Sequence, residues 1–204
     1  MSFCGVDPGA SGGLAVLDDI GRVLLVRRTP RTEPDVSRLF EHELVPLGIE
    51  HCYIEKVHAF PDAKDKEGNI LKRGQGVVSA FTFGRGAGVL IGCLLMAHIR
   101  FEEVEPRAWQ KIIGIPARMK KPKKQTLPMY PPEESQADFK RRLRARALQL
   151  FPGVDLNLMT ADALLLAESC RRVSLQMRGH AVALPTPKSD PDFTRVSTLA
   201  GDLP

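Results

Sequence analysis

The 204 residues fit one domain of ordinary size, and 43% hydrophobic with 26% charged residues exclude a disordered chain. A formal net charge of +5 is only a weak indication of a polyanionic partner. The longest apolar run, residues 87–99, is too short to cross a bilayer, so we expect no membrane partner.

Three short apolar runs separated by turns open the chain, and they predict an antiparallel meander of strands at residues 3–7, 12–17 and 23–27. Residues 33–47 follow with apolar side chains at helical spacing. Residues 51–57 are a further apolar strand, interrupted by one acid at Glu55.

The middle of the chain alternates between polar and apolar stretches. Residues 60–73 are polar and turn-rich, which predicts a mobile loop. Residues 74–98 are long and apolar, which predicts a buried helix, and their glycines suggest close approach of another backbone or a ligand. A short strand at 100–104 and a short helix from 106 to about 113 come next.

The second half of the chain is basic. Residues 114–132 are rich in Pro and Lys without apolar periodicity, which predicts a flexible loop. Helices are expected at 135–151 and 160–173, and residues 179–204 read as a weakly structured tail after a domain of residues 1–178. This order of elements predicts an α/β fold with a mixed sheet.

The four cysteines are scattered, without a CxxC pair or histidines at zinc-ligand spacing. Cys4 and Cys52 lie in apolar, strand-like runs, where a free thiol behaves as a small hydrophobic side chain. The opening residues MSFCGVDPG have an acid and a turn where a signal peptide would be hydrophobic. We therefore expect a reducing, cytoplasmic location.

Three acids stand among apolar neighbours: Asp7 and Glu55 at the ends of predicted strands, and Asp162 near the start of the last helix. Such a carboxylate is costly unless it is paired, protonated or bound to a metal. For each acid there is a structural alternative: Asp7 could cap a turn, Glu55 could pair across the sheet, and Asp162 could favour the helix start.

Taken together, the three acids predict a metal site. Oxygen ligands alone favour Mg²⁺ or Mn²⁺ over zinc. A pair of such ions could activate water and stabilise the leaving oxygen in phosphodiester hydrolysis. We therefore expect Asp7, Glu55 and Asp162 to be both the metal ligands and the catalytic residues.

Five segments, in this order, resemble the RuvC-like Holliday-junction resolvases, most closely their bacteriophage and prophage branch: GVDPGASGGLAVLD, YIEKVHAFP, QGVVSAFTFGRGAG, EPRAWQKIIG and ADALLLAES. The resemblance covers about residues 3–172. It implies a ribonuclease-H-like fold with a mixed five-stranded sheet flanked by helices, a homodimer, and Mg²⁺-dependent paired nicking of four-way DNA junctions in a bacterial or phage-infected cytosol. It places the family's acids on Asp7, Glu55 and Asp162.

The chain departs from the family pattern in one respect. The family usually shows a further acid or His three to five residues before the ADA motif, where this chain has Asn157, Leu158 and Met159. Only Asn157 offers an oxygen there. Asp155 lies two helical turns before Asp162, but Gly153 suggests that the helix does not extend that far, and Glu168 is expected to face solvent. The fourth ligand stays open, so a non-catalytic or broader branched-DNA-binding protein is the alternative function.

Basic residues gather between positions 107 and 146, as a nucleic-acid surface requires, although a solvated loop and helix face would look the same. The resemblance implies a phosphate-contacting Lys near Lys111 and an aromatic wedge near Phe60. Lysines of the predicted loop are further candidates for phosphate contacts: Lys120, Lys121, Lys123 and Lys124. An actin-like ATPase, suggested by DPGASGG, needs about twice this length and is not favoured.

Overall fold

A five-stranded mixed sheet in the order β3-β2-β1-β4-β7 organises the chain. The computed structural model describes residues 1–9, 12–59, 61–65, 67–118 and 134–179. The strands of this sheet are β1 (Ser2–Asp7), β2 (Gly13–Asp18), β3 (Val23–Arg28), β4 (Ile49–Glu55) and β7 (Phe101–Val104). The first three form the predicted antiparallel meander, and β4 and β7 add to it in parallel, which confirms the mixed sheet.

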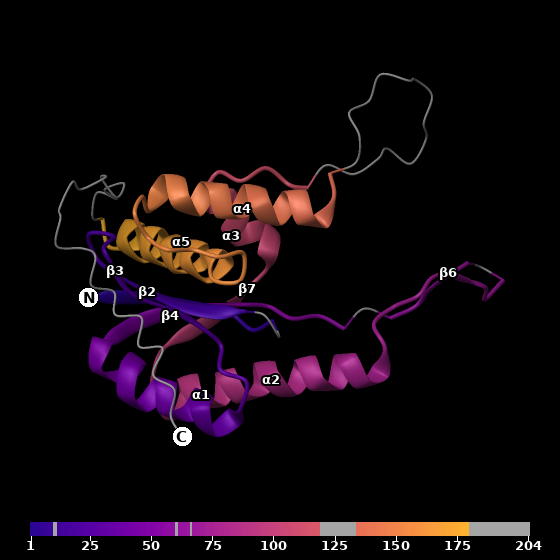
Figure 1. Cartoon of the computed structure of the whole chain (residues 1–204), viewed down its shortest axis with the longest axis horizontal. Helices are drawn as coiled ribbons and strands as arrows, with labels where there is room; N and C mark the ends of the chain where they lie inside the picture. The colour runs from indigo at the N-terminus through magenta and orange to yellow at the C-terminus, as the bar shows by residue number, and fades with distance from the viewer. Residues whose placement is uncertain (10–11, 60, 66, 119–133, 180–204) are drawn as a thin grey trace, which may run out of the picture.

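Helices cover both faces of the sheet (Figure 1). One face carries α3 (Pro106–Ile112), α4 (Gln136–Leu150) and α5 (Ala161–Met177). The other carries α1 (Glu33–Leu39) and α2 (Val77–Met96). The sheet therefore separates two apolar cores, one with α3, α4 and α5 and the other with α1 and α2.

The helix expected at residues 33–47 forms, but its geometry changes along its length. After α1 the chain continues as a π-helical turn (Phe40–Leu44) and a 3₁₀ turn (Val45–Leu47). Pro46 has no backbone N–H and cannot donate the hydrogen bond that an α-helix would need there. Gly48, at φ +59, then ends the turn and leads into β4.

Helix α5 lies against the centre of the sheet, and Gly5 of β1 makes the close approach possible. A Cβ atom at Gly5 would lie 2.2 Å from both the Ala163 carbonyl oxygen and the Ala167 amide nitrogen. Any side chain at this position would therefore push α5 away from β1. The start of α5, which carries Asp162, is held beside the end of β1 by this contact.

Glu168 was expected to face solvent, but it lies on the buried side of α5. Its side chain is fully buried, and it accepts hydrogen bonds from Arg171 at 2.7 and 3.0 Å and from Arg172 at 2.7 Å. Arg171 also donates to the Asp19 carbonyl in the turn between β2 and β3. This ion pair therefore joins α5 to the sheet and is not available as a metal ligand.

Two expectations for the middle of the chain need correction. The region expected to be a mobile loop at residues 60–73 contains a small hairpin of β5 (Ala63–Lys64) and β6 (Ile70–Lys72), which projects from the rest of the structure (Figure 1). The helix expected to be buried, α2, buries only Ala87, Leu90 and Leu94. The apolar composition was misleading because α2 packs on the sheet and beside α1, while the rest of its surface is exposed in the described part of the chain.

Helix α2 is long and apolar enough to span a membrane, with a mean hydropathy of 1.6. Only 17% of its most apolar 18-residue stretch is buried. The expectation of no membrane partner rested on the run at residues 87–99 alone, whereas α2 as a whole is longer and begins at Val77. Most of the predicted basic loop and all of the predicted tail beyond Gly179 lie outside the described residues, as do Phe60, Lys120, Lys121, Lys123 and Lys124. The expectations for them stay predictions.

Candidate active site

The fold brings the three predicted acids to one edge of the sheet. Asp7 and Glu55 end the neighbouring parallel strands β1 and β4, whose register pairs Val6 with Ile54, so the two acids follow at equivalent positions. Asp162 is the second residue of α5, which packs on β1. Residues far apart in the sequence thus become one group of carboxylates.

Each acid also has a contact of its own. One carboxylate oxygen of Asp7 accepts a hydrogen bond from the Gly9 N–H at 3.0 Å, so its role as a turn cap is real but leaves the other oxygen. The indole N–H of Trp109 donates to Glu55 Oε2 at 2.9 Å. Asp162 Oδ2 accepts from the Lys140 ammonium, while Asp162 Oδ1 is buried and has no hydrogen-bond partner among the described residues.

Glu55 is the acid whose proton affinity the site alters most clearly. Burial raises its pKa to about 7, and the negative charges of Asp7 and Asp162 act in the same direction. The hydrogen bond from Trp109 and the charge of Lys140 lower it by less. The site thus has an excess of negative charge, which is the electrostatic condition for binding a cation.

Lys140, on α4, is the cation that the structure adds to this group. Burial lowers the pKa of its ammonium, but the charge and hydrogen bond of Asp162, with the charges of Asp7 and Glu55, raise it more. The sequence pattern of α4 could have indicated that Lys140 points inward. Lys140 shares the side of α4 that Leu143, Ala147 and Leu150 bury, so it is a lysine at an otherwise apolar position.

Glu55, Asp162 and Lys140 open into a cavity of about 570 Å³, which is within the size range of ligand sites. Two arginines, Arg107 of α3 and Arg118, line the same cavity. A phosphate group could therefore lie between arginines and carboxylates. Sequence reasoning missed the two arginines as site residues, because they are separated from the acids along the chain.

No protein-family model and no curated protein matches the chain. Among solved structures, RuvC of Thermus thermophilus is similar with a TM-score of 0.51 and 13% identity, over 91% of this chain and 100% of that one. RuvC of the same organism in complex with Holliday junction substrate has a TM-score of 0.47 and 15% identity, over 89% and 98% of the two chains. The chain has a RuvC-like, ribonuclease-H-like fold. Its place in the bacteriophage branch stays a prediction.

Other predicted residues of this RuvC-like fold are exposed or are already paired. Lys111 is exposed on α3. Asn157 does not offer a free ligand oxygen, because its Oδ1 accepts hydrogen bonds from the Met159 and Thr160 backbone N–H groups at 2.8 and 3.0 Å. It stabilises the turn before α5, whose N-cap residue is Thr160, and the fourth acid of the family pattern has no replacement at this position.

The residues offer the oxygen ligands that a divalent cation needs, although they do not form a complete coordination site in this structure. Within the described ranges, no three His, Cys, Asp or Glu side chains already lie close enough together to hold an ion. Asp162 Oδ1 is buried without a hydrogen-bond partner among the described residues, and the pKa of Glu55 is raised. Both carboxylates would therefore be stabilised by a bound cation. Oxygen ligands of this kind suit Mg²⁺ or Mn²⁺.

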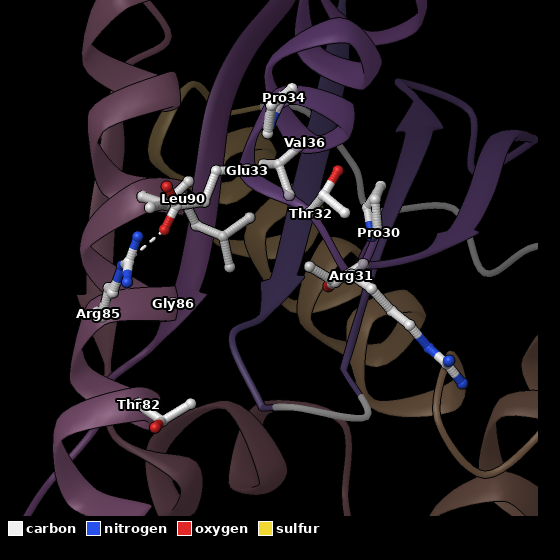
Figure 2. Close-up of a pocket in the computed structure, with 12 residues that line it drawn as sticks. Pro30, Arg31, Thr32, Glu33, Pro34, Val36, Thr82, Arg85, Gly86 and Leu90 are labelled. Atoms are coloured by element: carbon white, nitrogen blue, oxygen red, sulfur yellow. Dashed lines mark ion pairs between the residues drawn. The ribbon is translucent and has the colours of Figure 1, made fainter. Parts of the chain in front are cut away.

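A second cavity, of about 420 Å³, lies between α1 and α2 on the other face of the sheet (Figure 2). Arg85 of α2 pairs with Glu33 of α1 at 2.7 Å across it. Val36 and Leu90 form part of its lining. None of the three acids reaches this cavity, so the candidate active site is the one on the α5 side.

The raised pKa of Glu55 predicts a pH dependence of stability in metal-free protein. The folded state holds the Glu55 proton more tightly than the unfolded state, where the pKa is near 4.5. The contribution of Glu55 is therefore most favourable below this value and is lost as the pH rises to about 7. The loss is at most about 3 kcal/mol. Urea unfolding in the presence of a chelator, across this window, measures it.

The matched variants for this experiment are Glu55→Gln and Trp109→Phe. Glu55→Gln should remove the decline in this pH window, because the amide does not titrate. Trp109→Phe removes the hydrogen bond that lowers the pKa of Glu55, so the decline should extend to higher pH. A Glu55→Gln variant with the same pH profile as the wild type would contradict the burial of this carboxyl.

Proposed function

We propose that the chain is a metal-dependent, structure-selective endonuclease that resolves four-way (Holliday) DNA junctions by paired phosphodiester hydrolysis. The observation that carries the proposal is the meeting of Asp7, Glu55 and Asp162 at one edge of a RuvC-like fold, with a cavity lined by arginines beside them. The resemblance of the sequence segments to RuvC-like resolvases points to the same chemistry.

The side chains divide the work of this reaction. Asp7, Glu55 and Asp162 would hold Mg²⁺ or Mn²⁺, and a bound ion would activate water and offset negative charge on the phosphate. Arg107 and Arg118 line the cavity where the scissile phosphate would lie, and their guanidinium groups suit its oxygens. Trp109 orients Glu55 through its hydrogen bond, so that the carboxylate points into the site.

Branched DNA is the proposed partner. Lys111 is exposed on α3, the helix that also carries Arg107 at the cavity, and it would contact a phosphate beyond the active site. We propose that the lysines 120, 121, 123 and 124 extend this track and that Phe60 stacks on an opened base. By contrast, Arg142 and Arg144 of α4 bond to Glu134 and to the Leu156 carbonyl, which gives them structural roles.

The test is a synthetic four-way junction with labelled arms, incubated with Mg²⁺ or Mn²⁺ beside a linear duplex of the same sequence. We expect symmetric nicks in the junction and little cleavage of the duplex. Omitting the metal should abolish nicking. Binding should weaken as the salt concentration rises, because lysine contacts with phosphates release counterions. Cleavage of duplex and junction at equal rates would refute junction selectivity.

One observation favours a second candidate, a junction-binding protein without nuclease activity. The Lys140 ammonium already contacts Asp162, and the family's fourth acid is missing. Both features lower the affinity that the site would have for a divalent cation. The same assay separates the candidates, since tight, salt-dependent binding of the junction with no nick in either metal supports the second.

We also propose that the chain forms a homodimer through α2. The residues Val77, Phe81, Gly84, Gly88 and Leu95 fall on one side of this helix at 100° per residue. Val77, Phe81 and Leu95 are 86%, 71% and 60% exposed, and nothing lies within 4 Å of a Cβ built at either glycine. An exposed apolar face with small residues at a four-residue spacing suits close packing against a second, symmetry-related helix.

Gly88→Glu should therefore shift the protein from dimer to monomer, because it places a charge in the middle of the proposed interface. The matched control is Gly86→Glu, where a Cβ also meets nothing within 4 Å but points about 160° away around the helix. Sedimentation equilibrium measures the mass of each. A monomeric wild type would contradict the proposal, and wild type that partitions into detergent or vesicles would indicate a membrane-associated α2 instead.

A further inference from the structure

The side chain of Lys140 lies against a buried carboxylate of the candidate site. It contacts Asp162, whose side chain is only 6% exposed, and its own side chain is 37% exposed. The charges of Asp7 and Glu55 also act on its ammonium. One ammonium thus interacts with all three carboxylates of the candidate metal site.

The charges in the site match one divalent ion and not two. Three carboxylates bring three negative charges when ionised, and the ammonium cancels one of them. The two that remain are neutralised by a single divalent ion. A second divalent ion would leave the buried site with a net positive charge, which is unfavourable in a medium of low dielectric constant.

The two carboxylate oxygens of Asp162 also differ in their partners, as one ammonium and one ion would require. Oδ2 accepts the hydrogen bond from Lys140, whereas Oδ1 is buried and has no partner in the described part of the chain. One oxygen serves the ammonium, and the other is left for an ion. The side-chain oxygen of Asn157 is occupied in the turn before α5, where it accepts hydrogen bonds from the Met159 and Thr160 backbone N–H groups.

We propose that the Lys140 ammonium takes the place of a second divalent ion, so that the site binds one Mg²⁺ or Mn²⁺ per chain. This inference rests on the proposed metal-dependent function. It replaces the pair of ions that the three acids suggested in the sequence. Lys140 is then a charge-balancing residue of the metal site.

The test counts bound ions by titrating the full-length protein with Mn²⁺ and following free Mn²⁺ by electron paramagnetic resonance. We expect one ion per chain in the wild type. Lys140→Glu replaces the ammonium with a fourth carboxylate and should bind two. Lys140→Met removes the charge with little change in shape, and it should bind its first ion at least about tenfold more tightly. Circular dichroism checks that each variant is folded.

The matched control is Arg141→Glu. Arg141 is the next residue on α4, and it pairs with Asp138 on the exposed surface, where its side chain is 69% exposed. The same charge reversal there should leave the count at one. The control thus separates a local effect of Lys140 from a general change in the charge of the helix.

The outcomes separate this inference from the function on which it rests. Two ions in the wild type would overturn the role of Lys140 and leave the metal-dependent nuclease standing. One ion in the wild type and also in folded Lys140→Glu would likewise overturn it. No specifically bound ion in the wild type or in any variant would overturn the metal site itself, and the inference with it.

Discussion

Asp7→Asn is expected to lower the rate of junction nicking by at least about a thousandfold, while the junction still binds. Asp7 ends β1, and its charge acts on Glu55, Asp162 and Lys140 together. An amide at this position retains one neutral oxygen but loses the negative charge that would hold a divalent ion. Losing about 4 kcal/mol of charge stabilisation in the transition state corresponds to this factor.

The experiment measures single-turnover nicking of the four-way junction and, separately, binding by gel shift with the metal omitted. Asp19→Asn is the matched control, because Asp19 lies in the turn at the opposite edge of the sheet, between β2 and β3. It should nick at the wild-type rate. Equal nicking by Asp7→Asn and the wild type would refute the assignment of Asp7, and failure of Asp7→Asn to bind would indicate a folding defect instead.

Gly5→Ala is expected to cost about 3 kcal/mol of folding free energy and to reduce nicking more than the loss of folded protein explains. The added Cβ would lie 2.2 Å from two backbone atoms of α5, the Ala163 oxygen and the Ala167 nitrogen. Backbone cannot rotate away as a side chain can, so α5 must shift. Asp162 lies one residue before Ala163 and would move away from Asp7 with the helix.

Urea denaturation followed by circular dichroism gives the stability, and nicking is compared per mole of folded protein. The control is Gly86→Ala on α2, where a Cβ meets nothing within 4 Å. Alanine there should stabilise the helix by about 0.5–1 kcal/mol, because glycine is the poorer helix former. A neutral Gly5→Ala would show that β1 and α5 are less closely packed than the structure has them.

The strands and most helices could be predicted because their signals are local. The runs ending at Asp7 and Glu55 are apolar, short and closed by turns, and the structure confirms a strand at each. The last helix was found from its apolar composition, although it extends to Met177, beyond the expected end. Burial was harder to predict: α2 was expected to be buried and is largely exposed, whereas Glu168 was expected to be exposed and is buried.

Trp109 and Lys140 show why the site was only partly predictable. Trp109 is 1% exposed and belongs to the core, but its N–H also donates a hydrogen bond to Glu55. Lys140 looked like one more lysine of a basic helix, yet it contacts Asp162 on another helix. Both contacts join segments that are distant along the chain, and single-sequence patterns carry no information about such pairs.

The chain's pattern of apolar runs and turns was enough to predict the mixed sheet, and the isolated acids were enough to predict which carboxylates lie at one end of its strands, while their metal chemistry stays a prediction. The tertiary structure decided which groups share the site and which do not. It placed Lys140 beside the acids, put Glu168 in a buried ion pair and left one face of α2 exposed within the described residues. The reason is physical: periodicity reflects the neighbours that a residue has along its own element, whereas charge balance and burial depend on the elements packed against it.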